Sequence, residues 1–267
     1  DVEINVTAIP TSEFDAKLTA AITGGVVPDV VFLSTQTQRG LFETGAFQAV
    51  PDGLVDSDVF FPVAVEGTNL DGVTYGVPWY LYSRVMYYRS DLANDLGLSA
   101  PTTWDELRGF LQAFKDSGVE IPLSINLPWG RPTAEELMSF SAQNGGSFIS
   151  DDFSEWTIDT PENVEALDFW ASMVTDGLAS PDGPLFEDVT PYFTEGKSVA
   201  KVNGPWMPAG LAAANGQEWV DSHIASVAPP AGPAGSKAAI GGGTLAVLKD
   251  GDNTDAGWKL VRWLADP

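Results

Sequence analysis

The spacing of apolar and polar residues along the chain predicts strands that alternate with helices. Residues 2–7 alternate at period two, which is typical of a half-buried strand. Residues 12–23 have a helical period that ends at two glycines, and residues 29–33 form a short apolar run typical of a buried parallel strand. A second helix is expected as far as about Thr44. This order predicts an α/β fold with right-handed crossovers.

Helix-start signals continue the pattern through the rest of the chain. Thr103 and Glu106 form a capping box, which predicts a helix from there to Ser117. Pro161 after Thr160 suits a first helical position, and a glycine at 177 should end that helix. The other expected elements are strands at 121–125, 199–202, 224–228 and 239–248, a helix at 133–144, a loop at 229–236, and a last helix at 253–264 with Trp258 and Trp263 on its apolar side.

The segment 76–92 carries five aromatic rings and two arginines in a run that is expected to form one strand. A structural strand more often carries Val, Ile and Leu, because a buried indole N–H or phenol O–H needs a partner. Flat apolar faces beside fixed hydrogen-bond donors suit a sugar, which has C–H faces and hydroxyl edges. The run therefore predicts one wall of a carbohydrate cleft.

The charge balance and the residues that are missing restrict the chemistry. The 267 residues include 13 Lys and Arg against 37 Asp and Glu, a formal charge of −24, which repels nucleic acid and anionic membranes. There is no cysteine and one histidine, His223, so thiolate catalysis is excluded and His-rich metal sites are disfavoured. No apolar run reaches the length of a membrane span. We expect no cofactor, no metal and no nucleic-acid partner.

Eight short motifs follow one another in an order that resembles a known family. The chain resembles the extracellular solute-binding proteins of ABC transporters, in particular the sugar-binding group with maltodextrin- and trehalose-type binders. Each motif alone is weakly specific, but together they cover nearly the whole chain. They are GGVVPDVV (24–31), DGVTYGVP (71–78), MYYRSDL (86–92), PTTWDEL (101–107), QNGG (143–146), TIDTPEN (157–163), NGPW (203–206) and GGGTLAV (241–247).

The resemblance implies a two-lobed, type II periplasmic-binding-protein-like fold, in which a hinge closes the lobes on a ligand. It places the crossovers near 83–88 and 239–244, so lobe one would be 1–84 plus 243–267 and lobe two 85–242. It also implies an extracellular or periplasmic location, a lipid or signal anchor, an ABC permease as partner and a monomeric state. The family has a strand and a helix before the position of Asp1 and helices beyond Pro267, so this chain is expected to be incomplete.

The candidate ligand contacts combine the resemblance with the character of each residue. Many relatives carry an acidic residue at the position of Tyr82, so a ring there shifts the expected binding towards stacking. Tyr82 and Arg84 are two positions apart and would share one face of a strand, and Arg84 offers a planar fork of donors. The candidates are Gln36, Trp79, Tyr82, Arg84, Trp129, Arg131, Trp206, Gly242, Gly243 and Thr244.

Each candidate also has an ordinary structural interpretation. Trp79 and Trp206 could be core tryptophans, and Arg84 could form a salt bridge in so acidic a chain. Gln36 could simply begin a helix, while the glycines at 242 and 243 could allow a hinge bend instead of a close approach by ligand. His223 is expected to have no role.

Two other functions remain open from the residues alone. An aromatic cleft also suits a glycoside-processing enzyme, which needs two carboxylates about 5–10 Å apart. Tyr87 and Tyr88 could bind ferric ion, although strand alternation would turn their rings to opposite faces. Capture of a neutral mono- or oligosaccharide without catalysis, for import, is the leading hypothesis.

Overall fold

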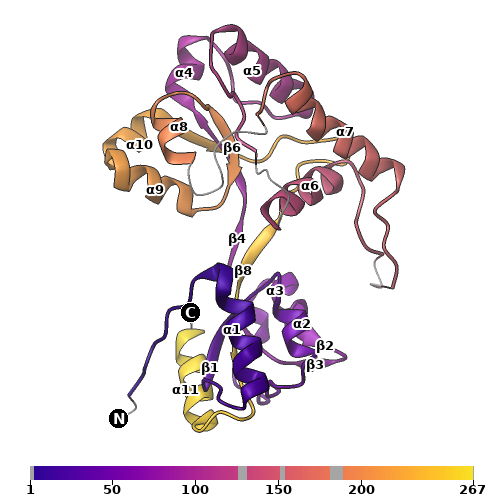
Figure 1. Cartoon of the computed structure of the whole chain (residues 1–267), viewed down its shortest axis with the longest axis vertical. Helices are drawn as coiled ribbons and strands as arrows, with labels where there is room; N and C mark the ends of the chain where they lie inside the picture. Colours follow the sequence, from indigo (N-terminus) through magenta and orange to yellow (C-terminus); the bar gives the residue numbers. More distant parts are fainter. Residues whose placement is uncertain (1–2, 126–130, 151–153, 181–188, 267) are drawn as a thin grey trace. The chain divides into compact units, whose positions relative to one another are not determined.

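The computed structural model describes residues 3–125, 131–150, 154–180 and 189–266. The chain divides into two compact units, which are described separately (Figure 1). Unit 1 consists of Asp1–Tyr82 and Gly241–Pro267, and unit 2 is Ser83–Ile240. The chain therefore passes between the units twice, once after Tyr82 and once after Ile240.

Unit 1 is built on a three-stranded sheet in which a late segment of the chain lies between two early ones. The strand order is β1 (Val30–Ser34), β8 (Ile240–Val247) and β4 (Val77–Ser83). β1 and β8 are antiparallel, with Val30 opposite Val247. The remaining elements are α1 (Thr11–Gly24), α2 (Gln38–Phe42), η1 (Ser57–Val59), α3 (Pro62–Glu66), the pair β2 (Asn69–Leu70) and β3 (Val73–Thr74), and α11 (Thr254–Leu264).

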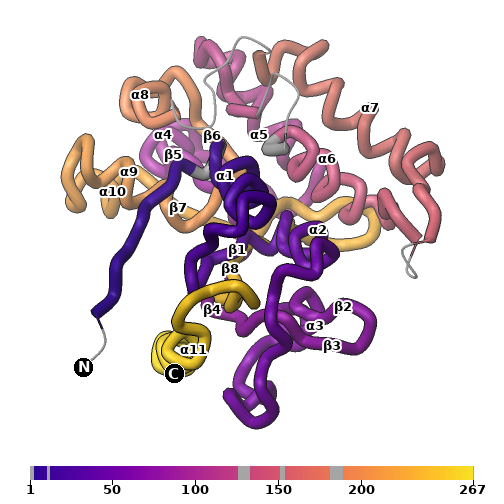
Figure 2. The backbone as a smooth tube through the Cα atoms, turned by 60° about the horizontal axis from the view of Figure 1, so that its bottom comes forward, coloured from indigo at the N-terminus to yellow at the C-terminus, as the bar shows by residue number. Residues whose placement is uncertain are grey.

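Helices cover both faces of this sheet. Leu18 of α1 packs in one apolar cluster with Val31 and Leu33 of β1. The strand residues that alternate with these point to the other face of the sheet. There they pack with Trp258 and Val261 of α11 in a second apolar cluster. Figure 2 accordingly shows α1 and α11 on opposite sides of β1 and β8. A strand buried on both faces explains why β8 has almost no polar side chains.

Unit 2 contains a second three-stranded sheet with its own helices. β5 (Val85–Arg89) lies between β6 (Ala200–Asn203) and β7 (Ile224–Val227), and both pairings are antiparallel. None of the helices in the described part of the chain is long and apolar enough to cross a bilayer. The helices of this unit are α4 (Ser90–Asp95), α5 (Trp104–Asp116), α6 (Arg131–Gln143), α7 (Pro161–Thr175), α8 (Val189–Thr194), α9 (Trp206–Asn215) and α10 (Gln217–His223).

The central strand β5 separates two apolar clusters in unit 2. Met86 belongs to the cluster formed with α5 and α7, and Tyr88 stacks edge-on against Phe110 there, 5.8 Å between ring centroids. Tyr87 belongs to the other cluster, with α8, α9 and α10. The expectation that Tyr87 and Tyr88 turn to opposite faces is therefore confirmed, and the two phenols cannot share one ion.

Most of the predicted elements are confirmed, often within two residues of the expected bounds. Thr103 accepts a hydrogen bond from the Glu106 amide at 3.2 Å and begins α5, and the Glu106 carboxylate reaches back to accept from the Thr102 amide at 2.7 Å. Pro161 is the first residue of α7, and α1 ends at Gly25 in the left-handed conformation. The α/β class is confirmed, but the buried strand β1 pairs antiparallel, not parallel as expected.

Three other predictions about elements are wrong. Residues 3–7 are exposed and form no strand, because alternation alone supplies no neighbouring strand to pair with. Residues 121–125 are buried but contribute only bridges at Leu123, to Ala179 and Ala200. Trp263 is 73% exposed, so of the two tryptophans expected on the apolar side of α11 only Trp258 is buried.

The aromatic run also differs from its prediction, because it is two strands and not one. β4 ends at Ser83, β5 begins at Val85, and the two strands belong to different sheets. Arg84 lies between the two strands. The argument that Tyr82 and Arg84 share one strand face is therefore wrong, since alternation does not continue through the break.

An arginine at the end of β5 ties together several elements of unit 2. Arg89 donates two hydrogen bonds to the Asp91 carboxylate, at 2.8 and 2.6 Å, and a third to the Phe193 carbonyl at 2.6 Å. Its guanidinium lies over the Trp219 ring at 5.3 Å, and Trp219 stacks on His223. His223 thus has a packing role that the sequence did not indicate.

We expect Asp91→Asn to destabilise the protein and to flatten its acid dependence. Burial alone would raise the pKa of Asp91, but hydrogen bonds and charge from Arg89 outweigh it and hold that pKa below its usual value. Such a carboxylate stabilises the fold above its unfolded pKa, and this stability is lost as pH falls through the folded pKa. Leaving Arg89 buried without its partner should cost about 3 kcal/mol at pH 7.

Urea unfolding of the wild type, D91N and D116N at pH 7 and at several values below pH 4 measures this. Asp116 is exposed and serves as the control, for which little change is expected. An acid dependence in D91N as steep as that of the wild type would contradict the assignment.

Candidate functional site

Four aromatic side chains gather on one part of unit 1, and we call this set the aromatic platform. Phe32 of β1 stacks on Tyr80 of β4, with ring centroids 5.7 Å apart and planes within 5°. Tyr80 stacks on Tyr82 at 6.3 Å, and Trp79 meets both Phe32 and Tyr80 edge-on. Because Tyr80 and Tyr82 are two positions apart on a strand, their rings form a row on one face.

The glycines of the middle strand make the platform possible. A Cβ at Gly243 would collide with the Phe32 ring, and one at Gly241 would collide with the Tyr82 ring. The rings of the two outer strands therefore lie across β8 where β8 has no side chains. At Gly242 a Cβ would meet the backbone of Tyr80, so this position permits close strand packing.

The platform offers both apolar faces and hydrogen-bonding groups. Trp79 and Tyr80 are 45% and 48% exposed, whereas Tyr82 is half-buried. Burial, and then the neighbouring Tyr82 phenol, raise the pKa of Tyr80. The Tyr80 hydroxyl therefore remains a neutral donor and acceptor at physiological pH.

Gln36 lies in the turn that follows β1 and is exposed. Its side-chain oxygen accepts a hydrogen bond from the Ser34 hydroxyl, and Ser34 is opposite Gly243 in the sheet. The amide of Thr35 donates to the Gly242 carbonyl at 3.3 Å, which holds this turn against β8. Gln36 thus lies at the end of the same sheet that carries the platform.

In unit 2, an arginine and a tryptophan from distant parts of the sequence are in contact. The Arg84 guanidinium lies over the Trp206 ring at 5.6 Å and is ion-paired with Glu135 of α6. Trp206 is the first residue of α9 and folds back over Gly204, where a Cβ would collide with its ring. Trp206 is 38% exposed, whereas Arg84 is 8% exposed. A half-exposed ring over a buried cation is a suitable surface for a polar ligand with an apolar face.

A buried lysine and a second glutamate adjoin this pair. Lys201 of β6 is fully buried, and Glu136 of α6 is 8% exposed. Burial lowers the pKa of Lys201, the charge of Glu136 opposes this effect, and the charge of Arg84 adds to it. Arg84, Lys201, Glu135 and Glu136 therefore form one cluster of two basic and two acidic side chains, which we call the charged cluster.

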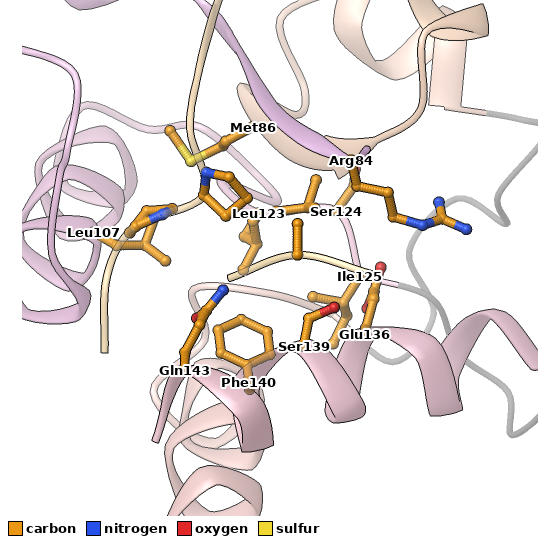
Figure 3. A pocket seen from close by; sticks show the side chains of 14 residues that line it. Arg84, Met86, Leu107, Leu123, Ser124, Ile125, Glu136, Ser139, Phe140 and Gln143 are labelled. Carbon is orange, nitrogen blue, oxygen red and sulfur yellow. The ribbon is translucent and has the colours of Figure 1, made fainter. Parts of the chain in front are cut away.

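A small cavity lies beside the charged cluster in unit 2 (Figure 3). Arg84, Glu136 and Ser139 line one end, and Leu107 and Phe140 are among the apolar residues elsewhere. Its volume is about 30 Å³, enough for roughly two water molecules. This cavity is too small for a sugar, so the exposed ring of Trp206 is the better candidate for ligand contact.

The comparisons with known proteins identify the family. All of residues 1–267 match the family described as "Bacterial extracellular solute-binding protein". The chain belongs to this family. Among its relatives, a putative binding protein of Brucella abortus is 25% identical over 98% of the chain, and the maltotriose-binding protein of Pyrococcus abyssi is 27% identical over 98%. The chain spans 64% and 56% of the lengths of these two relatives.

Solved structures of solute-binding proteins share the fold. The GacH receptor of Streptomyces glaucescens, solved without ligand and with acarbose, matches with a TM-score of 0.86 at 23% identity, over 97% of this chain and 66% of its own. An ABC substrate-binding protein from Listeria monocytogenes in complex with cycloalternan matches with a TM-score of 0.82 at 25% identity, over 100% and 68%. These likenesses confirm the predicted type II periplasmic-binding-protein-like fold.

Some candidate residues contact one another in the two sets described above, whereas the contacts of others favour a packing role. Trp79 and Tyr82 join one platform, and Arg84 and Trp206 join one cluster. Thr244 is buried and, like the neighbouring glycines at 242 and 243, packs against this protein's own atoms, which favours a packing role. Arg131 begins α6, and Trp129 lies outside the described residues. As ligand contacts, all ten residues remain predictions.

The sequence alone did not identify several members of the aromatic platform and the charged cluster. Phe32 alternates with buried residues of β1, a signal that alone cannot distinguish a platform residue from a core one. Lys201 lies in an apolar strand, and a lysine there is a usable sign of a buried charge. Glu135 and Glu136 gave no signal, because acidic residues are abundant in this chain.

We expect Gly243→Ala to destabilise unit 1, since the new methyl group would displace the Phe32 ring. The cost should be about 1–3 kcal/mol. Gly40→Ala is the control, because a Cβ there has open space within α2 and should be neutral or mildly stabilising. Equilibrium unfolding measures both variants. Partial recovery in the double variant G243A/F32L would establish the ring as the cause, and no loss in G243A would contradict the packing.

Removing two opposite members of the charged cluster together should cost less than the sum of the two single removals. We expect Lys201→Met and Glu136→Gln each to lower the free energy of unfolding by about 3 kcal/mol, because each leaves a buried charge imbalanced. The double variant should lose clearly less than the sum. Lys17→Met removes an exposed pair with Glu13 and should have little effect. Strict additivity in urea unfolding would show that Lys201 and Glu136 do not interact.

Proposed function

We propose that this protein binds a neutral mono- or oligosaccharide and delivers it to an ABC importer, without catalysis. The observation that carries the proposal is the aromatic platform of unit 1, in which the Trp79 and Tyr80 rings are about half exposed and Tyr80 carries a neutral phenol hydroxyl. Aromatic faces stack on the C–H faces of a sugar, and the hydroxyls bind its edges. Family membership and relatives such as the maltotriose-binding protein support the same function.

The two units would act as the two lobes of such a binder. In this proposal lobe one is 1–84 plus 243–267 and lobe two is 85–242, with hinge closure over the sugar. Trp79, Tyr82 and Gln36 would contact the sugar from lobe one. Arg84, the last residue of lobe one in this division, and Trp206 of lobe two would also contact the sugar, with Trp129 and Arg131 as further contacts in lobe two.

A binding energy estimate explains why both lobes are needed. Micromolar affinity requires about −8 kcal/mol. Each buried ring contributes on the order of 1–3 kcal/mol, and association itself costs at least about 4 kcal/mol. One platform is therefore too weak alone, and several rings from both lobes must contact the ligand.

The surface charge and the family suggest where the protein works. A formal charge of −24 suits an uncharged ligand better than a polyanionic one, since like charges repel. As a member of an extracellular family the protein would act outside the cytoplasmic membrane, as an anchored lipoprotein or in a periplasm. It would bind its permease as a monomer.

The intact protein that contains this chain should bind at least one sugar of a panel of mono- and oligosaccharides in a fluorescence titration. Trp79→Ala and Trp206→Ala should each weaken binding of that sugar by roughly 10- to 100-fold, as expected for the loss of one stacked ring. Trp156→Ala and Trp263→Ala are matched controls, because these rings are 74% and 73% exposed and belong to neither set.

Two results would contradict the proposal. One is a wild type that binds no sugar in the panel, by fluorescence and by calorimetry. The other is an affinity that falls as much in the control variants as in the Trp79 and Trp206 variants. Turnover of a chromogenic glycoside by the wild type would favour the enzyme alternative instead.

A further inference from the structure

The chain enters unit 2 next to Arg84 and leaves it next to Ala239. Both of these residues interact with the same helix, α6. The Arg84 amide donates to the Ala239 carbonyl at 3.4 Å, and the Ala239 amide donates to the Ser139 hydroxyl at 3.2 Å. That hydroxyl donates to the Glu135 carbonyl at 2.9 Å, and the Glu135 carboxylate is ion-paired with the Arg84 guanidinium. These four residues close a ring of interactions, which we call the crossing ring.

The crossing ring lies at the unit 2 ends of both passages between the units. Arg84 is the second residue of unit 2, and Ala239 is its second-to-last residue. One α-helical turn beyond Ser139, the Gln143 side chain donates to the Lys237 carbonyl at 2.6 Å. The same face of α6 therefore holds the outgoing segment at two points.

Arg84 belongs both to the crossing ring and to the proposed ligand site. Its guanidinium is ion-paired with Glu135 and also lies over the Trp206 ring. Arg84 is 8% exposed and the Glu135 side chain 15% exposed, so water screens this pair only weakly. Any movement of the guanidinium that a ligand on Trp206 causes must change the contact with Glu135.

We propose that Glu135 is a positioning residue that couples ligand contact at Trp206 to the two passages between the units. This inference rests on the proposed sugar-binding function. A ligand shifts a conformational equilibrium only as far as its contacts differ between the two states. Through Glu135 and Ser139, a change at Arg84 reaches Ala239, and both passages respond together.

The absence of cysteine from these 267 residues makes the coupling measurable with introduced cysteines. Ala20 of α1 and Ala213 of α9 are exposed and belong to different units. Cysteines introduced at these two positions can carry a donor and an acceptor dye. The fluorescence energy transfer then reports the ligand-dependent change between the units, while hydrogen exchange reports the amides of Arg84 and Ala239.

In the labelled protein, Glu135→Gln should weaken binding of the sugar that the wild type binds by roughly tenfold, as for one charge-assisted hydrogen bond. At saturating sugar it should also show a smaller shift in energy transfer than the wild type. Both amides should exchange faster than in the wild type, even without sugar. Ser139→Ala should have the same effects, and the double variant should lose less than the sum because both belong to one ring.

A matched control comes from a similar contact elsewhere in unit 2. Arg108 is ion-paired with Asp176 and lies over the Phe169 ring at 5.5 Å, but it touches neither passage. Asp176→Asn should therefore leave the sugar affinity, the shift in energy transfer and the two amides as in the wild type. Because the Arg108–Asp176 pair is more exposed than the Arg84–Glu135 pair, urea unfolding of both variants is measured beside the energy transfer, so that a general loss of stability is distinguished from coupling.

Each outcome of this experiment decides a different point. If the wild type binds sugar and E135Q shows the full shift at saturation, the coupling is overturned and the proposed function stands. If D176N reduces the shift as much as E135Q does, the coupling is also overturned. If the wild type binds no sugar of the panel, the proposed function fails and the coupling fails with it.

Discussion

The structure of unit 2 depends on keeping buried charges balanced in a chain that has few cations. Of 13 basic residues, two are buried side by side in the charged cluster. Lys201 is placed by the outer strand β6, Arg84 by the start of the chain in this unit, and both carboxylates by α6. Buried charges are tolerated only when they are paired, so α6 must lie where Glu135 and Glu136 neutralise them.

In unit 1, the partly exposed aromatic platform depends on glycines in the sheet and not on charges. Its sheet has helices on both faces, yet three glycines in the middle strand leave a region without side chains. Rings from β1 and β4 fill that region and remain partly exposed. Stacking among these rings fixes their orientation in the free protein, so little side-chain entropy would be lost if the proposed sugar bound there.

Much of the fold could be predicted because the relevant signals are local. The cap at Thr103 and the proline at 161 mark helix starts through hydrogen bonds within one turn. The break at Arg84 could not be predicted, because the residues on either side favour a strand equally and only the change of partner sheet separates them. Residues 3–7 show the converse, since a good strand pattern without a pairing partner forms no strand.

The candidate site was predictable in part, for the same reason. Trp79, Tyr82 and Trp206 were found because aromatic residues beside donors are unusual in strands and turns. Glu135 was missed because its importance comes from a contact 51 positions away in the sequence, with Arg84. Gly243 was identified for its lack of a side chain, but sequence alone did not reveal that a ring of this protein occupies the space.

The side-chain-free stretch of β8 has a consequence for how specificity can change. The rings of Phe32 and Tyr82 lie over glycine backbone, and Phe32 also packs against the apolar cluster that contains Trp258 of α11. Exchanging the Tyr82 ring for a smaller or more polar group would change the exposed surface of the platform, while the helices packed on the sheet keep their own contacts. Divergent relatives could therefore acquire new preferences by substitutions on the two outer strands alone, without redesigning the scaffold beneath them.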